Sequence, residues 1–123
     1  MNLIAAAMKA RKNAYARYSN FAVGAALRTV SGVVFTGCNV ENSAFGESMC
    51  AERVAVFAAV AAGERRFSHI AIIADCPAPL TPCGSCRQVL AEFDPDLVVI
   101  MANLKGQVTT KTARELLPLK FEL

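Results

Sequence analysis

The chain of 123 residues has the length of one domain and carries a small net charge of +3. Hydrophobic residues make up 54% of it, more than a lone domain of this size can bury, so we expect a large interface between subunits. No uncharged run is long enough to cross a bilayer. The 13 basic residues only slightly outnumber the 10 acidic residues, so the sequence indicates no strongly basic groove that could bind a polyanion. These features argue against a membrane protein and against a nucleic-acid-binding protein.

The first residues give no sign of a targeting segment. Residues 1–8 lack a leading positive charge and run directly into Lys9, Arg11 and Lys12, unlike a secretory signal peptide. We therefore expect a cytoplasmic protein, in which thiols stay reduced and a group of cysteines indicates metal binding more than disulfides. The basic cluster, which also includes Arg17, is typical of a solvated helix face.

The N-terminal part of the chain predicts a helix followed by a β-hairpin. Residues 2–15 are rich in alanine and then basic, and they predict a helix. Its inward-facing side chains are expected to be Leu3, Ile4, Ala7 and Met8. Residues 21–30 and 33–39 predict antiparallel strands joined by a two-residue turn, Ser31-Gly32.

The second strand of this hairpin ends in a polar segment over residues 37–42. In an extended chain Asn39 and Glu41 point to the same face, because side chains alternate. An amide beside a carboxylate can hold two neighbouring hydroxyl groups, as on a ribose. The alternative is that both are ordinary turn residues.

The middle of the chain predicts a buried helix and a buried strand. Residues 50–62 form a helix that Gly63 closes, and its later part is apolar on all sides. Residues 69–75 are a near-continuous apolar run, typical of a strand covered on both faces. The only histidine, His69, is interpreted as a residue at the start of this strand rather than a ligand. The proline-rich loop 75–82 follows the carboxyl end of the strand, where α/β sheets bind ligands.

The C-terminal part predicts further helices and strands. The predicted elements are a helix over 83–93, strands over 97–102 and 107–110, and a short helix over 112–117 that Pro118 stops. No linker or internal repeat interrupts the chain, so we expect a single domain over residues 1–123.

Three cysteines carry the strongest chemical signal. Cys83 and Cys86 stand at Cys-x-x-Cys spacing, and Cys50 precedes them. Three sulfur ligands leave one position of a zinc ion open, as in catalytic zinc sites. All three thiols open predicted helices, whose N-termini stabilise thiolates. Glu52 is then placed to carry protons to and from a water molecule at the open position. The alternative interpretation is that Glu52 forms a structural ion pair with Arg53.

Two other interpretations of the cysteines are open. A redox pair would leave Cys50 and Glu52 unexplained. A closed structural zinc site would need a fourth ligand, for which the candidates are Cys38, Cys76 and His69. None of these three belongs to a second ligand pair, so the combined spacing favours a catalytic site, and Cys38 and Cys76 are interpreted as buried, inert thiols.

With these residues in hand, the chain resembles the small three-cysteine cytidine deaminases of the homotetrameric branch. The matching stretches are residues 18–26, 37–42, 50–53, 82–88 and 115–118. The resemblance implies an α/β fold, a three-layer α/β/α sandwich on a five-stranded mixed sheet. It also implies hydrolytic deamination of free cytidine and deoxycytidine in pyrimidine salvage, with one zinc ion per subunit.

The resemblance implies a role for each metal-site residue. Cys50, Cys83 and Cys86 would hold the zinc ion, and Glu52 would move protons. Arg53 would offset the negative charge of three thiolates.

The resemblance also implies the substrate contacts. Asn39 and Glu41 would bind the ribose, Phe21 would pack on the pyrimidine ring, and the backbone of Ala51 would contact the base. Phe121 would reach into the site of a neighbouring subunit.

Three other functions are weighed against this one. A deaminase of a modified nucleoside such as blasticidin S would have a similar site. A deaminase of cytosines in RNA or DNA would need a basic groove, and the Asn39-x-Glu41 segment is typical of enzymes acting on free nucleosides. A non-enzymatic zinc-bearing assembly module would have no use for Glu52 beside an open metal position.

Overall fold

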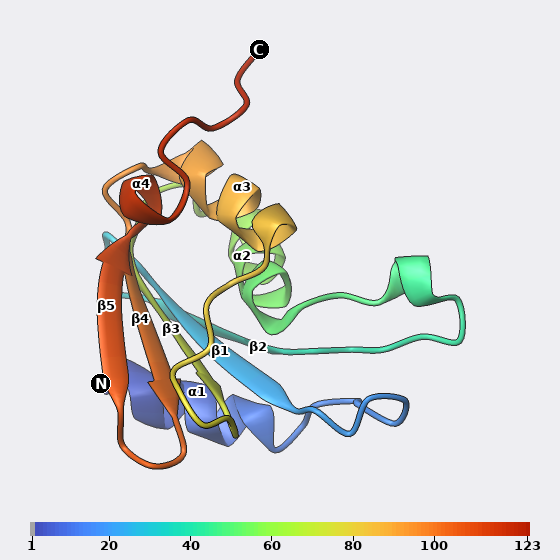
Figure 1. Cartoon of the computed structure of the whole chain (residues 1–123). Coiled ribbons are helices and arrows are strands. Elements are labelled where there is room, and N and C mark those ends of the chain that lie inside the picture. Colours follow the sequence, from blue (N-terminus) through green and yellow to red (C-terminus); the bar gives the residue numbers. More distant parts are fainter. Residues whose placement is uncertain (1) are drawn as a thin grey trace.

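The computed structural model describes residues 2–123. Five strands form one mixed sheet in the order β2-β1-β3-β4-β5, and helices cover both of its faces (Figure 1). The elements are α1 (Leu3–Arg11), β1 (Val23–Thr29), β2 (Val34–Cys38), the 3-10 helix η1 (Phe45–Glu47), α2 (Ala51–Ala61), β3 (Phe67–Ala74), α3 (Gly84–Phe93), β4 (Val98–Asn103), β5 (Val108–Thr112) and α4 (Ala113–Leu116). Only β3 and β4 pair in parallel. The predicted three-layer α/β/α sandwich is confirmed.

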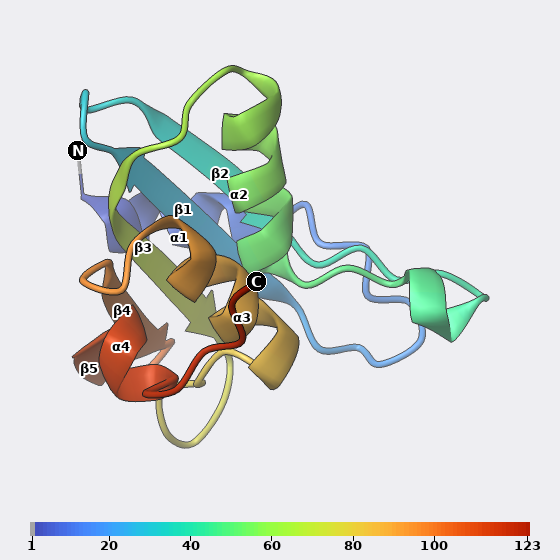
Figure 2. The same ribbon diagram turned by 90° about the horizontal axis from the view of Figure 1, so that it is seen from above.

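The two faces of the sheet are covered unequally. Figure 2 shows α1 alone behind the sheet and α2, α3 and α4 in front of it. Side chains alternate along β1, so Ala26 packs toward α1 while Ala25 and Leu27 pack toward the other helices. The larger core therefore lies under α2 and α3, the two helices whose first turns carry the cysteines.

Two glycines let helices lie directly on the sheet. A β-carbon on Gly24 would come within 2.0 Å of the Ala7 carbonyl oxygen of α1. A β-carbon on Gly37 would come within 2.5 Å of the Ala51 oxygen and 2.6 Å of the Ala55 nitrogen of α2. Gly37 thus fixes how closely the first turn of α2 approaches β2.

The first helix is shorter than predicted, and one of its inward residues was assigned wrongly. It ends at Arg11, and its buried side chains are Leu3, Ala7 and Ala10. Met8 is 40% exposed, because it lies about 100° around the helix from Ala7. Asn2 caps the helix, its side chain accepting from the backbone of the first turn.

The hairpin turn has three residues rather than two. Gly32 donates from its backbone nitrogen to the Thr29 oxygen over 3.0 Å, and Thr29 donates to Val33 over 2.8 Å. Gly32 has a φ of +96°, which closes a turn of residues 30–32 in the conformation that glycine adopts most readily.

Two predictions about the middle of the chain need correction. The strand β3 begins at Phe67, so His69 lies inside it, opposite Arg28 and Val98, and is not a boundary residue. Within a single chain the helix α2 is not buried on all of its sides, because Phe57 is 45% exposed. Gly63, with a φ of +94°, does close this helix as predicted.

A long arm projects from the body of the molecule. It consists of residues 13–21 and 39–49 and is visible beyond β2 in both views (Figures 1 and 2). Isolated bridges from Val40 to Tyr15 and to Met49 hold its segments together. Tyr18 and Phe45 pack edge to face near its tip, with ring centroids 5.8 Å apart.

No helix in the described part of the chain combines the length and the apolar character that crossing a bilayer requires.

Candidate active site

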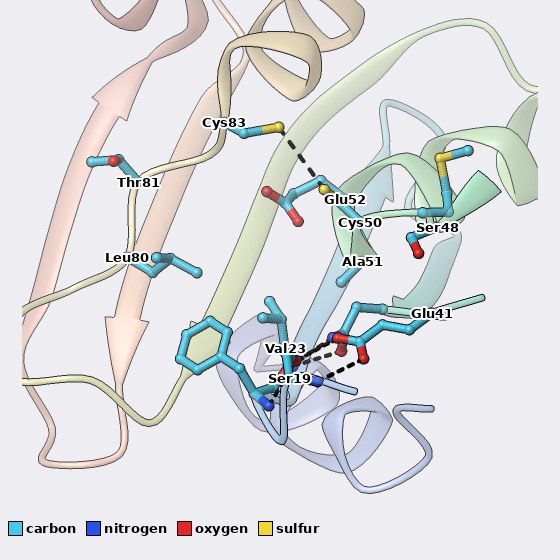
Figure 3. Close-up of a pocket in the computed structure, with 13 residues that line it drawn as sticks. Ser19, Val23, Glu41, Ser48, Cys50, Ala51, Glu52, Leu80, Thr81 and Cys83 are labelled. Carbon is cyan, nitrogen blue, oxygen red and sulfur yellow. Dashed lines mark hydrogen bonds between the residues drawn. The ribbon is translucent and has the colours of Figure 1, made fainter. Parts of the chain in front are cut away.

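A pocket of about 330 Å³ opens where the base of the arm meets the first turn of α2 and the loop after β3. Figure 3 shows the Cys50 and Cys83 sulfurs at one end of it and Glu41 with Ser19 at the other. The lining residues are Ser19, Phe21, Val23, Asn39, Glu41, Ser48, Met49, Cys50, Ala51, Glu52, Leu80, Thr81 and Cys83. The predicted ligand-binding role of loop 75–82 thus agrees with the position of the pocket.

Two helix N-termini bring the three predicted sulfurs together. Cys50 is the N-cap of α2, Cys83 is the N-cap of α3, and Cys86 lies in the first turn of α3. The Cys50 and Cys83 sulfurs are 3.9 Å apart, and all three lie within 4.8 Å of one another. Tetrahedral bonds of about 2.3 Å to zinc would place sulfurs about 3.8 Å apart, and the distance between the Cys50 and Cys83 sulfurs fits this value.

The sulfur group leaves room for a ligand that is not protein. Among the described residues, no further Cys, His, Asp or Glu atom joins it. Cys38 and Cys76 lie elsewhere and are half-buried rather than buried, and His69 lies within β3. None of the three candidate fourth ligands is therefore in place for a closed structural site.

The surroundings favour a thiolate at Cys50. A hydrogen bond with the Cys86 thiol, followed by the approach of Arg53, lowers the pKa of Cys50 to about 5. The same hydrogen bond, together with burial, raises the pKa of Cys86, which favours the protonated thiol. A bound metal ion would displace that proton and bind all three as thiolates.

Arg53 approaches the sulfurs rather than standing free in solvent. Its Nη2 donates to the Cys50 sulfur over 3.4 Å, and this contact raises the pKa of the guanidinium. Its Nε is buried and has no hydrogen-bond partner among the described residues. The geometry places a fixed positive charge beside the sulfur group.

Glu52 is the only charged residue that is buried in the described part of the chain. It is the second residue of α2 and only 4% exposed. Burial, and then the nearby Cys50 thiolate, raise the pKa of its carboxyl group. Figure 3 shows this carboxyl group beside the sulfurs of Cys50 and Cys83. A carboxyl group that readily holds a proton at this point can pass protons to and from a ligand in the pocket.

Asn39 ties the start of β1 to the pocket wall. Its Oδ1 accepts from the Val23 nitrogen and its Nδ2 donates to the Phe21 oxygen, both over 2.8 Å. The second Nδ2 hydrogen is left for another acceptor. Asn39 thus positions the backbone of Phe21 and keeps a donor for a ligand.

Glu41 lies in one segment of the arm and is held by the other, residues 13–21. Its Oε1 accepts from the backbone nitrogens of Tyr18, over 2.9 Å, and Ser19, over 3.0 Å, while its Oε2 accepts from the Ser19 hydroxyl. These bonds lower the pKa of Glu41, the bond from the Ser19 hydroxyl most. The carboxylate therefore stays ionised, with lone pairs left for a ligand hydroxyl.

Several pocket residues were not identified from the sequence. Ser48 and Met49 come from the arm, and Leu80 and Thr81 come from the loop after β3. The loop itself was expected to meet a ligand, but nothing in its sequence distinguished the residues that face the pocket from the others.

Phe121 does not line this pocket in its own chain. It is 70% exposed, and its backbone pairs with the side chain of Gln88 on α3, accepting over 2.9 Å and donating over 3.2 Å. Its predicted contact with a neighbouring subunit stays a prediction.

Comparisons with known proteins agree with zinc binding by this chain. The family model described as "Cytidine and deoxycytidylate deaminase zinc-binding region" matches residues 1–102. The chain belongs to this family. It is 49% identical to a cytidine deaminase of Sporosarcina psychrophila, across 97% of this chain and 88% of that protein. The crystal structure of cytidine deaminase from Burkholderia pseudomallei matches with a TM-score of 0.95 and 52% identity, across 97% of this chain and 96% of that one.

A blasticidin-S deaminase of Bacillus cereus is a more distant relative. It is 30% identical over 107 residues, which is 80% of this chain and 76% of that protein. The greater likeness to cytidine deaminases favours the main interpretation over the modified-nucleoside alternative.

Proposed function

We propose that the chain catalyses the hydrolytic deamination of cytidine and deoxycytidine to uridine and deoxyuridine, with release of ammonia. One observation carries this proposal: three sulfurs lie within 4.8 Å of one another, and two of their residues, Cys50 and Cys83, line a pocket together with the buried carboxyl group of Glu52. Membership of the cytidine and deoxycytidylate deaminase family supports it.

Cys50, Cys83 and Cys86 would hold one zinc ion per chain. When bound, zinc supplies Lewis acidity, which makes water a nucleophile at neutral pH. Three thiolates weaken that acidity, and Arg53 together with the N-termini of α2 and α3 offsets part of their charge.

Glu52 would perform the proton transfers. It takes a proton from the attacking water and delivers it to ring nitrogen N3, while the water oxygen adds to C4. It then takes the remaining proton from the new hydroxyl group on C4 and passes it to the amino group, so that the C4=O bond forms as the C–N bond breaks and ammonia leaves. The balance is one nucleoside and one water converted into the uracil nucleoside and ammonia. The raised pKa of this buried carboxyl group suits both steps.

The opposite end of the pocket would hold the sugar. Glu41 would accept from a ribose hydroxyl and Asn39 would donate to its neighbour, using the groups that their own contacts leave available. Phe21 would pack on the pyrimidine ring, and the backbone of Ala51 would contact the base. Sulfurs at one end and hydroxyl-binding groups at the other match the two ends of a nucleoside.

We further propose that residues 1–123 work as one domain in a cytoplasmic homotetramer, acting in pyrimidine salvage on free nucleosides rather than on nucleic acid. Large exposed apolar side chains on separate parts of the surface support a multi-subunit assembly. They include Phe45 on the arm, Phe57 on α2 and Phe121 in the tail. Phe121 would complete the pocket of a neighbouring subunit.

A substrate comparison tests the proposal. Ammonia release is measured with cytidine, deoxycytidine and blasticidin S at equal concentrations. We expect both cytosine nucleosides to be converted far faster than blasticidin S. Faster release from blasticidin S would support the alternative, and no release from any of the three would favour a non-enzymatic zinc module.

A further inference from the structure

The loop of residues 75–82, which joins β3 to α3, is held by side chains rather than by backbone pairing. In the described part of the chain, no backbone–backbone hydrogen bond outside the helices and strands involves residues 76–82. Asn103 donates from Nδ2 to the carbonyl oxygens of Cys76, over 3.1 Å, and Pro77, over 3.3 Å. Arg87 donates from Nε to the carbonyl oxygen of Pro82, over 2.8 Å. Asn103 therefore holds the first end of the loop from outside it, where the Cys76 thiol also donates to the Ala78 oxygen over 2.8 Å, and Arg87 holds the other end.

Asn103 is suited to this role by its position in the sheet. It is the last residue of β4 and lies beside Ala74, the last residue of β3, in the parallel pair. Its side chain therefore meets the chain just where the loop leaves the sheet. Asn103 is only 2% exposed, and a buried amide is costly unless its polar atoms are hydrogen-bonded.

The amide of Asn103 is also fixed in orientation. Its Oδ1 accepts from the backbone nitrogens of Lys105 and Gln107, each over 3.0 Å, while Nδ2 also donates to Gln107 Oε1 over 2.6 Å. Because two backbone N–H groups point at Oδ1, the NH₂ group has to face the loop. The turn between β4 and β5 thus holds Asn103 in the orientation that binds the loop.

The restrained segment is a wall of the pocket. Leu80 and Thr81 line the pocket and lie between the two held ends of the loop. Pro77, Pro79 and Pro82 each have a fixed φ, so a restraint at one end of the loop carries along the chain.

We propose that Asn103 is a positioning residue for substrate binding: by holding the carbonyls of Cys76 and Pro77, it fixes the Leu80–Thr81 wall against the bound nucleoside. This rests on the proposed function. Cys83 is placed separately, by α3 and by the bond from Arg87 to Pro82. Loss of the Asn103 contacts should therefore raise KM more than it lowers kcat, and should leave the metal site intact.

The test compares Asn103→Ala with Gln107→Ala. The second change removes one acceptor of Asn103 and leaves both bonds to the loop, so it is a matched control. For folded Asn103→Ala we expect KM for cytidine to rise at least about fivefold, with kcat within about threefold of wild type and zinc content unchanged. Hydrogen–deuterium exchange should become faster in the peptide that contains residues 76–82, and Gln107→Ala should change neither measurement more than about twofold.

Asn103→Ser, which keeps a hydroxyl acceptor for the turn, is measured in the same way if the alanine variant does not fold. A folded Asn103 variant with wild-type KM, or with unchanged exchange in the loop, would overturn the proposal. An equal KM increase in Gln107→Ala would also overturn it. A wild-type chain that converts no cytidine would instead overturn the proposed function, while the exchange comparison would still test whether Asn103 positions the loop.

Discussion

Glu52 and Arg53 are adjacent in the chain but meet the site in different ways. Glu52 is buried in the pocket lining, whereas Arg53 reaches back along the first turn of α2 to the Cys50 sulfur. Neither residue serves mainly as the ionic partner of the other. Replacing Glu52 should therefore affect proton transfer, and replacing Arg53 should affect the charge balance at the sulfurs.

Replacement of Glu52 by glutamine should abolish most turnover without disturbing the metal. The amide has nearly the same shape but cannot carry a proton, so we expect kcat to fall by about 10²- to 10⁴-fold. Zinc content and melting temperature should stay near those of wild type. The control is Glu64→Gln, beyond the other end of α2, which should leave kcat unchanged. Turnover above a tenth of the wild-type rate would remove Glu52 from its proposed role.

Replacement of Arg53 by alanine should weaken zinc retention. It removes the hydrogen bond to Cys50 and the positive charge that stabilises its thiolate. Changes to groups that support metal ligands lower affinity by about 10- to 100-fold, and we expect a loss in this range in competition with a chelator. Arg66→Ala removes one positive charge from an exposed site and is the control. Equal zinc affinity in both variants would mean that Arg53 has no part in charge balance.

The sequence singled out the three cysteines and Glu52 as candidate ligands and proton carrier because short spacings carry that information. Cys83 and Cys86 are three residues apart, so the first turn of α3 brings them to one side, and Cys50 and Glu52 both stand at the start of α2. Leu80, Thr81, Ser48 and Met49 could not be predicted, because irregular backbone decides which of their side chains face the pocket. The proposed role of Asn103 depends on the parallel pairing of β3 with β4, which no local sequence pattern indicates.

At the scale of the elements, the site depends on how closely α2 lies on the sheet. The contact of α2 with Gly37 sets the position of its first turn, which contains Ala51 and Glu52 and follows Cys50. Helix and strand types were predicted well from hydrophobic periodicity. Element ends were predicted less well, because capping by Asn2, the three-residue turn after β1 and the bridges of the arm decide them.

Replacement of Gly37 by alanine should therefore destabilise the fold and disturb the site together. The added methyl group would meet the backbone of α2 at 2.5 Å and 2.6 Å, which the backbone can relieve only by moving. We expect a loss of about 1–3 kcal/mol or more in the free energy of unfolding by urea, together with weaker zinc binding. At Gly46 a β-carbon would meet nothing within 4 Å, so Gly46→Ala should change stability by less than about 0.5 kcal/mol. Equal stability of the two variants would contradict this view of the α2 contact.

At the scale of the whole molecule, the chain leaves large apolar side chains in solvent. The expectation that α2 is buried on all sides fails within one chain, yet the exposed Phe57 is what a subunit contact would cover. The high hydrophobic content anticipated this, but the sequence did not indicate which face of which helix would be left open.

Replacement of Phe57 by glutamate should therefore break the assembly. We expect light scattering to give the wild-type chain a molar mass of about four times 13.1 kDa and to give the variant a smaller mass. Val108→Glu is the control, because Val108 is 49% exposed on the edge strand β5. A monomeric wild-type chain, or an unchanged mass for Phe57→Glu, would contradict the proposed role of this face.

The most direct test of the catalytic account is X-ray absorption at the zinc edge, measured on protein whose cytidine turnover has been recorded. We predict one zinc ion per chain, with three sulfurs at about 2.3 Å and one lighter ligand at about 2.0 Å. An ion enclosed by four protein ligands, or full turnover by protein that contains no zinc, would contradict the account.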